Sequence, residues 1–308
     1  MARAGRSRFI PLRPASFKGH LMAEPSTSRP RAALLLMLAG LFAALAPIAP
    51  LRAQEPEFFD VPYAKEQWNY GRRLDESQLR FCVDGQDPDW EVSAEIGQAL
   101  ALALLLEPVP HVVRRDTVIE DITVIYETML QHCDVFLGFK LIPEGYQDWL
   151  TLTRPYYAAR YDFVTLDPAL GSLDDLARDR PIGAKMGTMA FLSLVFYRNS
   201  VPAAERWPLY PMGSNEQALD ALAGGRVDVA LVWAPTLWAH AQAGSVPATL
   251  RRIEPSPLAP ASIPVGAVLL SDEIFLRTAL DEAIAALAAD GTIAGILARF
   301  DFPAEVMP

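Results

Sequence analysis

The sequence predicts an α/β protein with two domains, the first of which is built from two separated parts of the chain. Three observations favour this fold class. The chain has 308 residues, 51% of them hydrophobic, which suffices for the cores of two modest domains. From residue 79 onward, short apolar runs of strand length alternate with stretches of helical spacing. The series breaks near Leu166 and again near Ile263, which predicts two crossings and a hinge.

The first 53 residues have the pattern of a secretory signal. Arg29 and Arg31 precede an apolar run from 32 to 51 that glycine and proline interrupt, and the segment ends at Ala53. We therefore predict cleavage after Ala53 and a periplasmic location. A membrane anchor is the alternative, because the run approaches spanning length. Met22 is an alternative start, since the residues before it add nothing that such a signal needs.

Removal of residues 1–53 leaves 19 basic and 36 acidic residues, a formal charge of −17. A surface of this charge repels nucleic acid and anionic lipid, so we expect neither as a partner and no stable membrane insertion after cleavage. It would suit a basic protein partner, although solubility explains it equally well. Residues 54–78 are polar and aromatic without a clear period, which predicts an N-terminal extension on the surface.

The predicted elements of the first domain come from 79–166 and 264–308. Its strands are 79–83, 111–115, 134–138 and 265–270, and its helices are 93–106, 117–131 and two within 272–300 that break near Gly291. Ser93 is expected to cap the first helix. Residues 161–166 are interpreted as an extended connection to the second domain.

The second domain, residues 167–263, repeats the alternation. Its predicted helices are 172–177, 188–197, 214–223 and one from Pro235, and its predicted strands are 181–184, one near Leu209, and 228–233. The Gly187-Thr188 turn at a helix start offers unpaired amides to an anion.

The sequence shows no motif that carries enzyme chemistry. It has four histidines and two cysteines without zinc-ligand spacing, and it lacks a P-loop, a dinucleotide fingerprint and a nucleophile elbow. We therefore predict that the protein is not an enzyme and uses no metal and no cofactor. Asp84 and Glu91 form a possible acidic pair for catalysis, but turns and helix starts are commonly acidic.

A ligand or partner cleft is expected where the strands end, because open α/β sheets bind ligands there. The candidate residues are Asp84, Trp90, Phe139, Lys140, Tyr157, Lys185, Gly187, Thr188 and Trp233. The aromatic members would stack on a flat ligand or on a partner's segment, with core packing as the alternative for Phe139 and Tyr157. Trp90 is expected in a loop. The two lysines would offset an anion or be solvated, and Thr188 would alternatively only cap its helix.

Cys82 and Cys133 are disulfide candidates, since an oxidising compartment permits pairing. Both lie near strands that we expect to be neighbours. Their register argues against a bond, because Cys82 comes late in its strand and Cys133 early, and offset residues on parallel strands separate by about 3.3 Å per residue. The sequence leaves the pairing open.

Four segments between Leu79 and Pro303 carry a resemblance to a known family: LRFCVD with its following aromatic, CDVFLGF to RPYY, DLARDRPIGAKMGT, and GGRVDVALVW. Together they resemble the periplasmic type 2 solute-binding proteins of family 3. The resemblance implies a two-lobed fold with a hinge, in which residues 79–166 and 264–308 form one lobe and residues 167–263 the other.

The predicted cleft departs from the amino-acid-binding members of that family. In those proteins an arginine after a Pro-Glu pair clamps the ligand carboxylate, whereas here Gly145 follows the pair. They also place an aspartate for the ligand amine at the end of the strand that here ends in Trp233. Without both charged anchors, the desolvation of a buried zwitterion would stay uncompensated.

One subgroup resembles the chain more closely, namely the J-type periplasmic proteins, MoxJ and XoxJ, encoded beside PQQ-dependent methanol dehydrogenases. The matching features are Cys82, Cys133-Asp134-Val135, Thr153 to Tyr157, and Val227 to Trp233 before Pro235, whereas the first loop, GQDPDW, differs from the usual Leu-Pro-Phe segment. The resemblance implies an accessory role in the maturation or activation of the quinoprotein dehydrogenase of methanol oxidation in methylotrophs, rather than solute import, with that dehydrogenase as protein partner. The alternatives are the substrate-binding subunit of an ABC importer for a small apolar or aromatic organic acid, and an enzyme on the same fold such as a dehydratase.

Overall fold

The computed structural model describes residues 77–114, 122–142 and 145–308. These residues all belong to one compact unit. The predicted signal at 1–53 and all but two residues of the predicted extension at 54–78 fall outside the described residues. Within the described ranges, no helix combines the length and the apolar character that a membrane crossing requires.

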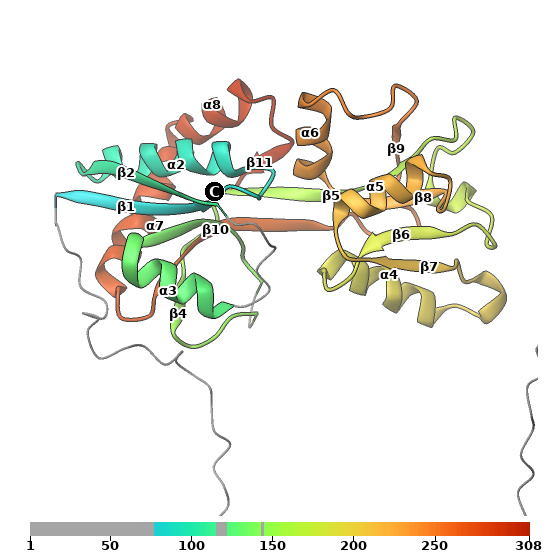
Figure 1. Ribbon diagram of the computed structural model, residues 1–308, viewed down its shortest axis with the longest axis horizontal. Helices are drawn as coiled ribbons and strands as arrows, with labels where there is room; N and C mark the ends of the chain where they lie inside the picture. The colour runs from blue at the N-terminus through green and yellow to red at the C-terminus, as the bar shows by residue number, and fades with distance from the viewer. Residues whose placement is uncertain (1–76, 115–121, 143–144) are drawn as a thin grey trace, which may run out of the picture. The chain divides into compact units, whose positions relative to one another are not determined.

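The described part of the chain contains one mixed sheet of eleven strands, with the main order β2-β1-β3-β10-β5-β8-β6-β7 (Figure 1). The strands are β1 (Gln78–Asp84), β2 (Glu107–Val113), β3 (Val135–Lys140), β4 (Leu150–Leu152), β5 (Tyr157–Thr165), β6 (Ile182–Lys185), β7 (Leu209–Met212), β8 (Val229–Trp233), β9 (Arg251–Ile253), β10 (Ser262–Leu270) and β11 (Ala304–Val306). β4 pairs with β10, and β9 and β11 pair with β5.

β5 joins two halves of this sheet. Its residues 157–160 pair with β10 and β11, whereas its residues 161–165 pair with β8 and β9. We call β1 to β4 with β10 and β11 the first half-sheet, and β6 to β9 the second half-sheet. The predicted extended connection at 161–166 is thus the end of a strand that both halves share. The domain boundaries at 166 and 263 stay a prediction.

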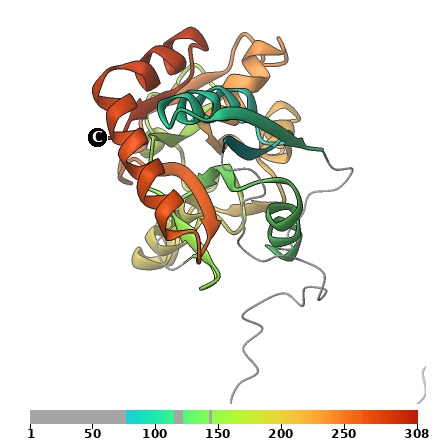
Figure 2. The ribbon, with the colours of Figure 1, turned by 90° about the vertical axis from the view of Figure 1, so that its left-hand side faces the viewer.

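Helices cover both half-sheets. They are α2 (Trp90–Ala103), α3 (Ile122–His132), α4 (Met189–Ser200), α5 (Asn215–Ala223), α6 (Ala234–Gln242), α7 (Ile274–Ala289) and α8 (Thr292–Arg299), with 3-10 turns at Leu173–Asp175 and Ala203–Glu205. On the first half-sheet, α2, α7 and α8 lie on one face and α3 lies on the other (Figure 2). Successive residues of β1 point to opposite faces of the sheet. Phe81 packs in the hydrophobic cluster that contains α2, whereas Cys82 packs in the cluster that contains α3.

Cys82 and Cys133 form a disulfide, with Cα atoms 5.6 Å apart. This confirms the pairing that the register argued against. Cys82 lies opposite Phe136 in the parallel pair β1–β3, so a straight extension of β3 would place Cys133 about 10 Å away along the strand. Cys133 instead lies in the turn after His132, the last residue of α3, and therefore returns over the sheet face that carries Cys82.

α2 begins and ends three residues earlier than predicted. Asp89 occupies its N-cap position, and the amide of Ser93 already donates to the carbonyl oxygen of Asp89 within the first turn. The prediction that Ser93 caps this helix is therefore wrong, and Ser93 is buried in its interior face. At the other end, Leu105 has φ of 59°, a left-handed conformation that ends the helix.

Candidate binding cleft

The candidate site lies where four strands from both half-sheets end. Asp84, Lys140, Lys185 and Trp233 are the last residues of β1, β3, β6 and β8. β1 runs parallel to β3, and β6 runs parallel to β8, so each half presents its carboxyl ends at one edge. This edge is the ligand position of open α/β sheets.

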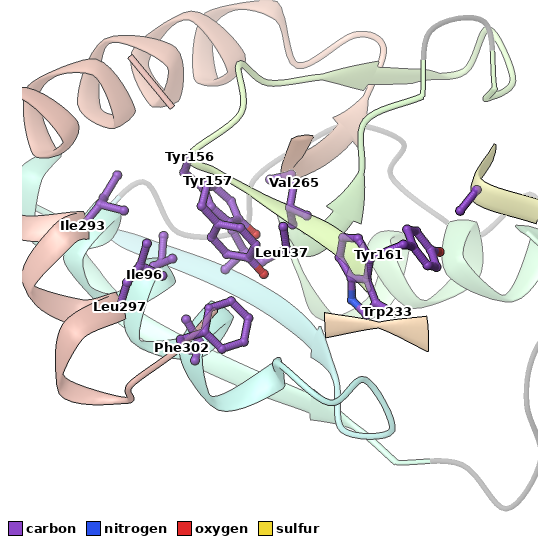
Figure 3. Packing of buried hydrophobic residues seen from close by; sticks show 14 of the residues in the cluster. Ile96, Leu137, Tyr156, Tyr157, Tyr161, Trp233, Val265, Ile293, Leu297 and Phe302 are labelled. Carbon is purple, nitrogen blue, oxygen red and sulfur yellow. The ribbon is translucent and has the colours of Figure 1, made fainter. Parts of the chain in front are cut away.

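Lys140 contacts Trp233 from the other half-sheet. Its Nζ lies 5.1 Å from the centroid of the Trp233 ring, a cation–π contact. Tyr161 packs against the same indole with ring centroids 4.9 Å apart, and the hydroxyl of Tyr146 donates to the carbonyl oxygen of Lys140 at 2.6 Å. Figure 3 shows Tyr161 beside Trp233, apart from the group of Tyr157 and Phe302.

The indole nitrogen of Trp233 lacks a hydrogen-bond acceptor among the described residues, although the side chain is 98% buried. A buried N–H without an acceptor carries a desolvation cost that a bound acceptor would remove. The Lys140 ammonium group therefore supplies a positive charge beside Trp233, whose indole N–H is a hydrogen-bond donor without an acceptor in the described ranges.

Aspartates of the loop after β1 face Lys140. Burial raises the pKa of Asp87 to about 7; Lys140 and Lys185 act in the opposite direction, while Asp89 and Asp84 add to the increase. Burial alone would lower the pKa of Lys140, but the carboxylates of Asp87 and Asp89 outweigh it, so this pKa lies above its usual value. Lys140 is therefore an ammonium ion at neutral pH.

Two buried tyrosines contact the elements that carry these groups, one the loop after β1 and the other β3. The hydroxyl of Tyr157 donates to the carboxylate of Asp89, and the amide of Gly138 donates to the hydroxyl of Tyr156 at 2.8 Å. Burial raises the pKa of both tyrosines, so both stay neutral. Gly138 has φ of 86°, which favours glycine and turns β3 so that its amide reaches Tyr156. Tyr157 is fully buried in the main apolar cluster and reaches the site through Asp89.

A cavity of about 200 Å³ lies beside Lys140. It is lined by Asp84, Asp87, Ile125, Phe136, Gly138, Phe139, Lys140 and Tyr146. Phe139 is partly buried here, between the rings of Phe136 and Tyr146. Trp90 lines a different cavity of about 260 Å³ with Gln86 and Arg114, and it is the first residue of α2 rather than a loop residue.

Three of the candidate residues, Lys185, Gly187 and Thr188, lie between the end of β6 and the start of α4. The hydroxyl of Thr188 accepts from the amide of Phe191 at 3.1 Å and donates to the carbonyl oxygen of Lys185 at 3.0 Å, so Thr188 caps the helix. Gly187 is exposed, with φ of 78°. Lys185 is partly buried, and its charge lowers the pKa of Asp87 across the site. Anion binding by this turn stays a prediction.

The sequence reasoning missed Asp87, Asp89, Tyr146 and Tyr161. For the two acids a signal was present, because three aspartates occur within residues 84–89, directly after a strand. Tyr161 has no local signal, since its contact with Trp233 depends on the pairing of β5 with β8. Among the residues with assigned structure, no group of three or more His, Cys, Asp or Glu side chains is arranged to hold a metal ion.

No protein-family model matches the sequence, and no curated protein matches it. Solved structures do match. The ligand-binding core of GluR0 in complex with L-glutamate has 17% identity and a TM-score of 0.54, covering 72% of this chain and 97% of that chain. A histidine kinase sensor domain with similarity to periplasmic binding proteins has 16% identity and a TM-score of 0.53, covering 73% of this chain and 97% of that chain. This chain has the fold of the two-lobed periplasmic binding proteins.

An arginine transport system periplasmic binding protein from Legionella pneumophila has the same fold, with 17% identity, a TM-score of 0.51, and coverage of 72% of this chain and 99% of that chain. These three similar structures are binding proteins and a sensor domain. At this level of identity the likeness shows the fold, and the strand ends described above lie where open α/β sheets bind ligands.

Proposed function

We propose that this chain is an exported, non-catalytic binding protein that serves a PQQ-dependent dehydrogenase as an accessory, by binding the enzyme or by assisting its maturation. The observation that carries the proposal is the contact of Lys140 with Trp233. The amine of a free amino acid would meet a positive charge at this strand end, and Asp87 already faces Lys140. Amino-acid import is therefore disfavoured, and the motifs shared with MoxJ and XoxJ then favour the accessory role.

An exposed apolar stripe, which runs from the turn before α4 along one face of that helix, supports a protein partner. It consists of Met186, Met189, Leu192 and Phe196, which are 61%, 45%, 41% and 69% exposed. The last three are three and four residues apart, so they lie on one face of the helix. The stripe begins next to Lys185, at the edge of the cleft. Adaptable, methionine-rich apolar surfaces of this kind are typical of protein contacts.

The accessory role predicts that the purified protein captures a purified PQQ-dependent dehydrogenase at low salt. Phe196→Asp should weaken capture at least tenfold, because it places a carboxylate in the stripe. Phe275→Asp is the matched control, since Phe275 is another exposed phenylalanine but lies at the start of α7. Capture that does not exceed that of an unrelated acidic periplasmic protein would contradict the proposal, as would equal effects of the two substitutions.

A second function, capture of a small aromatic or apolar organic acid for import, is favoured by the indole N–H of Trp233. This donor lacks an acceptor in the described ranges and belongs to the ring that the Lys140 ammonium contacts. A ligand carboxylate would accept from the indole and be attracted by the lysine.

The second function predicts that an aromatic carboxylate such as benzoate or phenylacetate stabilises the protein against heat. The gain is about 2.7 kcal/mol at one hundred times the Kd. Trp233→Phe keeps an aromatic ring but removes the donor, so it should reduce the shift. The neutral amide benzamide keeps an acceptor but lacks the charge that Lys140 attracts, so it should give a smaller shift than the acid. Equal shifts with the acid and the amide, or none across a panel of such acids, would exclude this ligand class.

A further inference from the structure

We propose that Lys140 is the built-in occupant of an ammonium-binding subsite, and that the subsite accepts a small primary alkylammonium ion once the Lys140 side chain is removed. The inference goes beyond both functions above, because it concerns the kind of group that the surroundings of the Lys140 ammonium are shaped to bind. With Lys140 in place, a ligand that brings its own positive charge to this position is rejected.

The subsite has an aromatic wall and an acidic wall. The aromatic wall is the indole of Trp233, whose ring centroid lies 5.1 Å from Nζ, with Tyr161 packed against it. The acidic wall is formed by Asp87, which lines the same cavity as Lys140, together with Asp89 two residues further along the same loop. Aromatic faces combined with carboxylates are the chemistry that binds alkylammonium ions in proteins.

Backbone contacts fix the point from which the Lys140 side chain starts. Lys140 pairs with Val265 of β10, its carbonyl oxygen accepts from Tyr146, and the amide of Leu141 donates to the carbonyl oxygen of Pro264 at 2.8 Å. Exposed lysines normally extend their strongly hydrated ammonium group into water. Here the ammonium instead lies over a ring from the other half-sheet, which indicates that the surroundings are formed for this group.

A purely structural explanation makes a different prediction. If Lys140 merely neutralised the aspartates, any small cation would replace it. If it occupies a shaped subsite, the replacement must have both the charge and the length of the missing side chain. Lys140→Ala removes three methylene groups and the ammonium group, which together are the atoms of n-propylammonium.

The experiment measures thermal unfolding of the full protein, Lys140→Ala and Lys185→Ala in n-propylammonium chloride, sodium chloride or n-propanol. Lys185 is the matched control, because it also ends a strand at the cleft. We expect n-propylammonium to raise the Tm of Lys140→Ala in a saturable manner, with affinity at least tenfold higher than for the other two proteins. Neither sodium nor propanol should reproduce this rise.

Equal stabilisation of Lys140→Ala by sodium or by propanol would overturn the proposal, and so would an equal response of Lys185→Ala. Lys140→Met fills the subsite with an uncharged side chain, so n-propylammonium should not raise its Tm. A rise in Tm as large as that of Lys140→Ala would also count against the proposal. If Lys140→Ala fails to fold, refolding is compared in the two salts. A higher yield in n-propylammonium supports the proposal, and equal yields overturn it. The assay contains neither a dehydrogenase nor an organic acid, so its outcome can be distinguished from the outcomes of the tests of the two proposed functions.

Discussion

Replacement of both Cys82 and Cys133 by alanine is expected to lower the free energy of unfolding by about 4 kcal/mol. The disulfide joins residues that are 51 positions apart, so it restricts a long loop in the unfolded chain. Chain-entropy arguments assign about 4 kcal/mol to a loop of this length. Both residues are buried between α3 and the sheet, and alanine avoids placing new polar groups there.

Urea unfolding of the oxidised protein, the reduced protein and the double variant measures this effect. The reduced protein is the control for lost side-chain volume, because it keeps both sulfur atoms. We expect the reduced protein and the double variant to unfold at similar urea concentrations, well below that of the oxidised protein. If the free energy of unfolding of both proteins falls by less than about 1 kcal/mol relative to the oxidised protein, the loop between the two cysteines is not an unrestricted chain in the unfolded state, and the prediction is wrong.

Asp87→Asn is expected to stabilise the protein above pH 7 and to have little effect near pH 4. The pKa of Asp87 is about 7 in the folded protein and 3.8 in an unperturbed aspartate. Between these values the folded state holds a proton that the unfolded state has lost, so stability falls as pH rises through this window. The separation of the two pKa values corresponds to at most roughly 4 kcal/mol. Asparagine resembles the protonated acid and removes this loss.

The measurement is the Tm of both proteins between pH 4 and pH 8. Asp290→Asn is a control of opposite sign, because hydrogen bonds from Thr292 lower the pKa of Asp290. A lowered pKa gives stability that is present above the unfolded value and is lost in acid, so this control should weaken the protein at neutral pH. Parallel Tm curves for wild type and Asp87→Asn across the whole range would show that Asp87 does not titrate in this window.

Local sequence patterns predicted most of the fold, because short apolar runs mark strands that are buried on both faces, such as β1, and helical spacing marks the apolar faces of the long helices. Three short strands were not predicted, namely β4, β9 and β11, since three residues carry no period and each forms by pairing with β10 or β5. The position of Asp89 at the start of α2 was missed because Ser93 offers an equally good cap signal in the sequence.

For the site, the strand ends were predictable and the contacts between them were not. Asp84, Lys140 and Trp233 could be found because parallel strands end at one edge. The contact between Lys140 of β3 and Trp233 of β8 joins residues 93 positions apart in the sequence, and no local pattern encodes that contact. The disulfide was left open for the same reason, since its geometry depends on the path of the turn after α3.

The shared strand β5 limits how far the two half-sheets can move relative to each other when a ligand or partner binds. Residues 160 and 161 are neighbours in the chain, but they pair with strands of opposite half-sheets. This connection therefore has no flexible linker, and movement of one half-sheet relative to the other requires twisting of β5. We expect such a joint to hold the binding surface preorganised, so that a guest loses little free energy to ordering it. Association would then be governed by fit to an existing surface.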